Sequence, residues 1–99
     1  MNPDRDYILA LLCEHRRSLA DLGVVSIGLF GSAVRGELSA TSDLDFLVRL
    51  RTNTFDAYMD VKEYLERLFE RRIDLVLDGA LKPALRDRIV KEAVHAEGF

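Results

Sequence analysis

The sequence predicts a small α/β protein in which a mixed three-stranded sheet is covered by helices. Segments with apolar residues at helical spacing alternate along the chain with short apolar runs that are typical of strands. The chain has 99 residues, of which 48% are hydrophobic and 31% are charged, and this fits one globular domain spanning residues 1–99. No internal repeat or low-complexity tract interrupts the pattern.

The first segments are a predicted helix and a predicted strand. Residues 4–22 predict the helix, and Gly23 is its stop signal. The apolar residues that recur there at helical spacing are Ile8, Leu11, Leu12, Leu19 and Leu22. The apolar run at residues 24–30 then predicts a buried strand.

A turn and a second strand follow. Gly31-Ser32 ends the first strand, and residues 32–36 predict a short helix or turn. The Ser- and Thr-rich residues 37–42 predict a loop, and the alternating residues 43–50 predict a strand. On one face of that strand lie Leu44, Phe46 and Val48, and on the other Asp43, Asp45 and Leu47.

The last third of the chain predicts a helix, a strand and a helix. Residues 55–70 carry a wide apolar stripe, with Thr54 or Asn53 as the cap of this helix. Residues 72–77 predict the third strand, and the chain then turns at Asp78-Gly79. A final helix is expected over residues 82–96. Pro83 suits its first turn, and its expected inward residues are Leu85, Ile89 and Ala93.

Composition excludes several classes of protein. The formal net charge is −3, and the charges of both signs are spread along the chain, so we expect no direct binding to DNA through a basic surface. A single cysteine, Cys13, cannot form an internal disulfide, which favours a reducing cytoplasm. The polar, acidic start does not resemble a signal peptide, and no apolar run approaches the ~20 residues of a membrane span.

Two aspartates carry the strongest chemical signal. Asp43 and Asp45 are two positions apart on a predicted strand and therefore share a face. At ~6–7 Å and an effective dielectric constant of ~20 their repulsion is roughly 2–3 kcal/mol, which a divalent cation such as Mg²⁺ would remove. Two such ions would clamp the attacking and leaving oxygens of a phosphoryl or nucleotidyl transfer. The alternative is the solvated face of an edge strand.

A glycine-serine pair precedes these aspartates. Gly31 lets the backbone come close to a ligand, and the hydroxyl and N–H of Ser32 would bind the terminal phosphates of a nucleotide. Arg35 would contact phosphate as well. The alternative is a plain strand-to-helix turn, with Ser32 as the N-cap and Arg35 in solvent.

The glycine-serine pair and the two aspartates together indicate a protein family more specifically than either motif does alone. Gly31-Ser32, then ten residues, then Asp43-x-Asp45 resembles the signature of the nucleotidyltransferase superfamily that includes DNA polymerase beta. Arg35-Gly36 and Ser42 stand where small prokaryotic members carry them. The chain resembles a minimal nucleotidyltransferase (MNT), the antitoxin half of HEPN/MNT toxin–antitoxin pairs, and the resemblance implies the nucleotidyltransferase fold.

The resemblance also implies a third carboxylate on the neighbouring strand. Asp74 fits this position, and Asp78 is the competing candidate. By this resemblance Asp43 and Asp45 hold two Mg²⁺ ions, and Asp74 completes one metal site and helps to activate the acceptor hydroxyl. Alternatively, Asp74 is an edge residue paired with Arg71 or Arg72.

The function implied by the resemblance is transfer of AMP from ATP to a hydroxyl, that of a tyrosine, on a cognate HEPN ribonuclease toxin, which is thereby neutralised. Two alternatives stay open. The chain would neutralise its toxin by binding alone, or it would modify a small molecule such as an aminoglycoside. Lys82 and Arg86 would reach the triphosphate or a partner, or form a solvated face.

Overall fold

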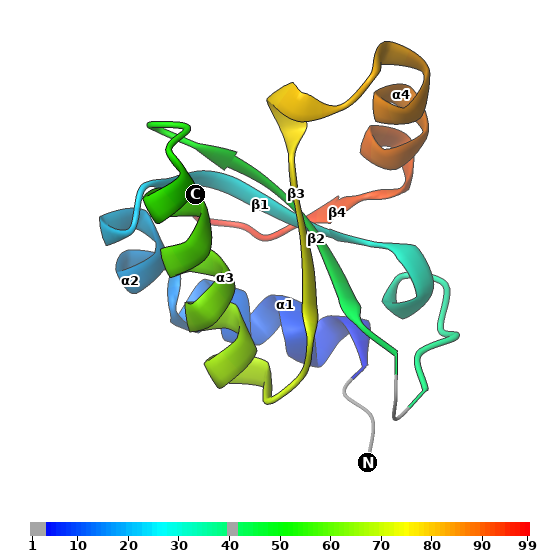
Figure 1. Cartoon of the computed structure of the whole chain (residues 1–99). Coiled ribbons are helices and arrows are strands. Elements are labelled where there is room, and N and C mark those ends of the chain that lie inside the picture. The colour runs from blue at the N-terminus through cyan, green and yellow to red at the C-terminus, as the bar shows by residue number, and fades with distance from the viewer. Residues whose placement is uncertain (1–3, 40–41) are drawn as a thin grey trace.

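The computed structural model describes residues 4–39 and 42–99, so residues 40 and 41 of the predicted loop lie outside the described part. Helices and strands follow one another as α1 (Arg5–Glu14), α2 (Arg16–Asp21), β1 (Val24–Phe30), β2 (Leu44–Leu50), α3 (Phe55–Phe69), β3 (Ile73–Leu77), α4 (Pro83–Glu92) and β4 (Val94–His95). Short 3-10 helices follow β1 and β3, at Gly31–Ala33 and Asp78–Ala80. The α/β class and all three predicted strands are confirmed (Figure 1).

Local sequence signals explain where the helices begin. The side chain of Asp4 caps α1 by accepting a hydrogen bond from the Tyr7 N–H at 2.7 Å. Thr54 caps α3 in the same way, with its hydroxyl 3.1 Å from the Ala57 nitrogen. Pro83 occupies the first turn of α4, where its missing N–H is harmless. The predicted first helix is two helices, because the backbone leaves helical geometry at His15 before α2 begins.

The sheet has the strand order β3-β2-β1-β4. β1 pairs antiparallel with β2 and with β4, whereas β2 pairs parallel with β3. The fourth strand corrects the prediction of a helix over residues 82–96. Ala93 adopts an extended backbone at the end of α4, and Val94 and His95 then pair with Leu29 and Gly28 of β1. Two residues are too short a run to show strand alternation in the sequence.

One face of the sheet carries the hydrophobic core. The fully buried residues from α1, α2, α3, β1 and β2 are Ile8, Leu12, Leu19, Ile27, Leu29, Leu44, Phe46, Val48, Val61 and Leu65. Because side chains alternate along a strand, Asp45 and Arg49 lie on the face opposite to Phe46 and Val48. The helix layer thus anchors one face of the sheet, and the other face carries Asp45 and Arg49 together with the buried Leu47.

Helix α4 stands apart from the helix layer, as Figure 1 shows. It has no buried residue, and Leu85 is 47% exposed. The prediction that Leu85 faces inward is therefore wrong, because the turn after β3 carries α4 away from the core that α1, α2 and α3 cover. No helix among the described residues is long and apolar enough to cross a membrane.

Candidate active site

Two of the predicted acidic residues lie opposite each other on neighbouring strands. In the parallel pairing of β2 with β3, Asp45 is the register partner of Asp74, and on its other side Asp45 pairs with Phe30 of β1. The neighbours of Asp45 along β2, Leu44 and Phe46, are fully buried. This burial holds Asp45 on the open face of the sheet, where Asp74 joins it.

The electrostatics of Asp45 show that the acidic residues act on one another. Burial, then the charge and hydrogen bond of the Asp74 carboxyl group, and then the charge of Asp43 together raise the pKa of Asp45 from 3.8 to about 6. The guanidinium of Arg35 opposes this shift. Asp43 precedes β2 directly and is exposed, as is Asp74, whereas Asp45 is half-buried. The three carboxylates and Arg35 therefore form one electrostatic cluster.

This cluster is a partial set of metal ligands. Across residues 4–39 and 42–99, no group of three or more acidic, histidine or cysteine side chains is arranged so that it could hold a metal ion by itself. Mg²⁺ is usually held by one or two carboxylates together with phosphate oxygens and water, and not by a cage made of protein alone. Asp45, with the carboxylate of Asp74 opposite, is suited to bind a cation whose remaining ligands are phosphate oxygens of a bound ligand.

Gly31 connects the acidic cluster to the turn after β1. Its φ is +78°, and a Cβ atom built on it would overlap Asp45 Oδ2. Glycine is thus required twice, once for the backbone conformation and once for the close approach of the carboxylate. The predicted short helix or turn is confirmed as the 3-10 helix Gly31–Ala33. Ser32 lies half-buried inside it and does not act as its N-cap, because that position belongs to Phe30.

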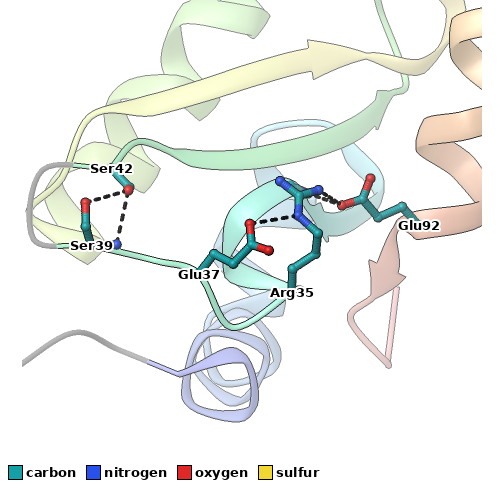
Figure 2. A network of polar contacts seen from close by, with 6 residues as sticks. Arg35, Glu37, Ser39, Ser42 and Glu92 are labelled. Atoms are coloured by element: carbon teal, nitrogen blue, oxygen red, sulfur yellow. Dashed lines mark hydrogen bonds and ion pairs between the residues drawn. The ribbon is translucent and has the colours of Figure 1, made fainter.

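Arg35 is held from two sides (Figure 2). Its Nε donates to Glu37 Oε2 at 3.2 Å, and its Nη1 donates to Glu92 Oε1 at 2.5 Å. The Gly31 N–H donates to the same Glu92 oxygen at 3.2 Å. Sequence reasoning missed Glu92, and no local signal marks it, because it lies 61 residues from Gly31 at the end of α4. Arg35 is therefore exposed to solvent, as the alternative interpretation expected, but it is also paired with two glutamates.

The loop that leads into Asp43 is closed by serines and an arginine. The hydroxyls of Ser39 and Ser42 lie 2.8 Å apart, as Figure 2 shows. Arg71 Nη1 donates to the carbonyl oxygens of both serines at 2.9 Å. No ion pair within the described residues joins Asp74 to Arg71 or Arg72. Arg71 thus holds the start of β2, and the carboxylate of Asp74 stays available on the open face.

Asp78, the competing candidate, belongs to a different contact. Its carboxylate pairs with Arg86 at 2.5 Å and with Arg49 at 3.4 Å. The hydrogen bond from Arg86 lowers the pKa of Asp78 below its ordinary value. Asp78 therefore ties the start of α4 to β2, and the register partner of Asp45 is Asp74 instead. Arg86 is likewise occupied by this structural ion pair.

Comparison with known proteins agrees with this geometry. The family profile described as "Nucleotidyltransferase domain" matches residues 12–95. Protein adenylyltransferase MntA of Thermococcus cleftensis is 37% identical over 90 residues, which cover 89% of this chain and 91% of that protein. A solved structure provisionally named a minimal nucleotidyltransferase is 35% identical, with a TM-score of 0.73 over 87% of this chain and 93% of its own.

A more distant structure shares the fold. It is a tri-AMPylated HEPN toxin of Shewanella oneidensis in complex with an MNT antitoxin, and the matched chain is 21% identical with a TM-score of 0.64. The match covers 92% of this chain and 73% of that one. At this identity the similarity shows a common architecture.

We expect Gly31→Ala to destabilise the protein more than Gly36→Ala. The two glycines have similar positive φ values, +78° and +74°, so an alanine costs about 1 kcal/mol of backbone energy at each. Only at Gly31 would the added methyl group overlap Asp45, which adds about 1–3 kcal/mol. Urea unfolding at pH 7 measures the two losses, and equal losses would contradict the close approach.

We expect Asp45→Asn to stabilise the metal-free protein in a pH-dependent way. The pKa of Asp45 is raised from 3.8 to about 6 in the folded state. Folding therefore carries a penalty that is absent below about pH 4, grows as pH rises towards 6, and is complete above it. Because the carboxylate is only half-buried and partly screened by water, we expect a gain of about 1–2 kcal/mol at pH 8.

Urea unfolding in EDTA at pH 4 and pH 8 measures this gain. Asp60→Asn, on the exposed side of α3, is the matched control for loss of one carboxylate. The interpretation is wrong if the stability difference between Asp45→Asn and the wild type is the same at both pH values.

Proposed function

The chain belongs to the nucleotidyltransferase domain family, and from this membership we propose that it is an antitoxin that transfers AMP from ATP to a toxin. The acceptor is a hydroxyl group, that of a tyrosine, on a HEPN ribonuclease, and the modification neutralises the toxin. The name of the Thermococcus relative, a protein adenylyltransferase, supports a protein acceptor. The AMPylated HEPN toxin bound to an MNT antitoxin in the distant structure supports the toxin class.

The observation that carries the proposal is the pairing of Asp45 with Asp74 across β2 and β3, beside Gly31. Asp43, Asp45 and Asp74 are the residues that would hold Mg²⁺. When bound, Mg²⁺ supplies positive charge to the phosphate oxygens and to the attacking and leaving groups. Burial raises the pKa of Asp45 most, and repulsion by Asp74 and Asp43 adds to it; a cation would offset both costs of ionising Asp45, which supports a cation site here.

The remaining residues bind and orient the substrates. We assign the β- and γ-phosphates to the Gly31 N–H, to Ser32 and to the Arg35 guanidinium. Arg35 lies close enough to Asp45 to lower its pKa, so phosphates bound by Arg35 lie beside the acidic cluster. We assign the α-phosphate to the neighbourhood of Asp74, whose side chain is exposed and therefore accessible to an acceptor.

The reaction is an in-line displacement. The acceptor oxygen forms a bond to the α-phosphorus while the bond from that phosphorus to the bridging oxygen breaks, and pyrophosphate leaves. The acceptor proton passes to a carboxylate oxygen of Asp74. Product release leaves AMP esterified to the toxin. We place this reaction in the cytoplasm, in keeping with the free thiol of Cys13.

We expect the toxin to gain mass in whole AMP units when it is incubated with the chain, ATP and Mg²⁺. Asp43→Asn, Asp45→Asn and Asp74→Asn should each abolish the gain, because each removes a proposed metal ligand. Intact-protein mass spectrometry of a HEPN-type toxin incubated with the chain measures the transfer, and Asp60→Asn is again the control. Neutralisation of the toxin without a mass gain would instead indicate inhibition by binding alone.

We expect Ser32→Ala to weaken ATP binding by about 2–10-fold, the loss of one hydrogen bond of ~0.5–1.5 kcal/mol. Calorimetric titration with ATP and Mg²⁺ measures the dissociation constant. Ser18→Ala, on the exposed surface of α2, is the matched control. Unchanged affinity in Ser32→Ala would remove Ser32 from the phosphate site.

A further inference from the structure

A carboxylate of the chain itself occupies the proposed phosphate position. One oxygen atom, Glu92 Oε1, accepts hydrogen bonds from both the Gly31 N–H and Arg35 Nη1, at 3.2 Å and 2.5 Å. These donors come from the turn after β1, whereas Glu92 is the last residue of α4. Two of the three groups assigned to the phosphates are therefore already bound to an anion.

The contacts of Glu92 are those that a phosphate oxygen would make. A backbone N–H and a guanidinium that converge on one atom favour a negatively charged oxygen, and such charge-assisted bonds are stronger than neutral ones. A phosphate oxygen cannot take the same place while Glu92 Oε1 is there, and the two anions would repel each other. The two ligands therefore exclude each other at these donors.

We propose that Glu92 is an internal anion that fills the phosphate position in the nucleotide-free protein and leaves when a nucleoside triphosphate binds. This inference rests on the proposed function, since it concerns the same site. Glu92 thereby controls the affinity for the nucleotide. The nucleotide binds only after Glu92 has left the Gly31 N–H and Arg35, so its apparent affinity is lower than it would be without Glu92.

Two features let Glu92 leave without disturbing the rest of the site. Glu37 holds Arg35 through Nε and not through Nη1, so the guanidinium keeps one partner when Glu92 departs. Figure 2 shows the two glutamates on opposite sides of Arg35. The Glu92 side chain is 31% exposed, so it can turn towards solvent while the following strand, β4, stays paired with β1.

The test compares Glu92→Gln with Glu37→Gln by calorimetric titration with ATP and Mg²⁺. Each substitution removes one negative charge from a direct partner of Arg35, but only Glu92 also occupies the Gly31 N–H. We expect Glu92→Gln to tighten ATP binding by about 3–10-fold, because the neutral amide competes less well for the donors. We expect no tightening in Glu37→Gln.

The possible results of the titration distinguish a failure of this inference from a failure of the proposed function. If the wild type binds ATP and Glu92→Gln binds it equally or more weakly, the inference is wrong and the nucleotide site stands. Equal tightening in both variants also overturns it, since loss of charge alone would then suffice. If neither the wild type nor Glu92→Gln binds ATP, the proposed function fails and the inference with it. Binding by Glu92→Gln alone would support the inference.

A measurement on the wild type keeps the test valid if a variant does not fold. The ¹³C signal of the Glu92 carboxylate is expected to shift when saturating ATP and Mg²⁺ are added, because that carboxylate exchanges its donors for water. A Glu92 signal that stays unchanged while ATP is bound would overturn the inference whatever the variants show.

Discussion

The repulsion between Asp45 and Asp74 is the constraint on which the rest of the site depends. Partial burial makes ionisation of Asp45 unfavourable, and the carboxylate of Asp74, in register on the adjacent parallel strand, makes it more so. The sheet tolerates the pair because Leu44 and Phe46, on either side of Asp45, are fixed in the core. Burial of apolar residues on one face of the sheet thus holds the carboxylates of Asp45 and Asp74 close together on the other face. A bound cation would remove the repulsion between them.

The division of the sheet into two faces explains how a small chain combines a core with a reactive surface. Helices α1, α2 and α3 cover one face, and α4 lies outside this layer. The open face is bordered by the turn after β1 and by the first residues of β2 and β3, so three separate segments contribute to one site. Gly31 is the point where they meet, because its missing side chain makes room for Asp45.

Charged side chains near both ends of helix α4 contact the rest of the fold. Arg86 at its start pairs with Asp78, and Glu92 at its end binds Gly31 and Arg35. Contacts of this kind, between partly exposed groups, exchange readily with other ions, whereas a packed apolar helix does not. In our proposal, the Glu92 contact is the one that a bound phosphate replaces.

The sequence by itself determined the three main strands, the glycine-serine turn and the alternation that sets Asp43 and Asp45 apart from the core. These features depend on periods of two residues and on local backbone preferences, both of which can be read within a short window. The family resemblance then selected Asp74 for the third position, and the strand register brings it to Asp45.

Only the tertiary structure decided how distant segments meet. The pairing of β4 with β1, the exposed setting of α4, the ion pairs of Asp78 and the contact of Glu92 with Gly31 all join residues that no sequence window contains. Each of these contacts depends on the path that the chain takes after β3. That path is set by the pairing of β4 with β1 and by ion pairs between distant residues, and local propensity does not determine it.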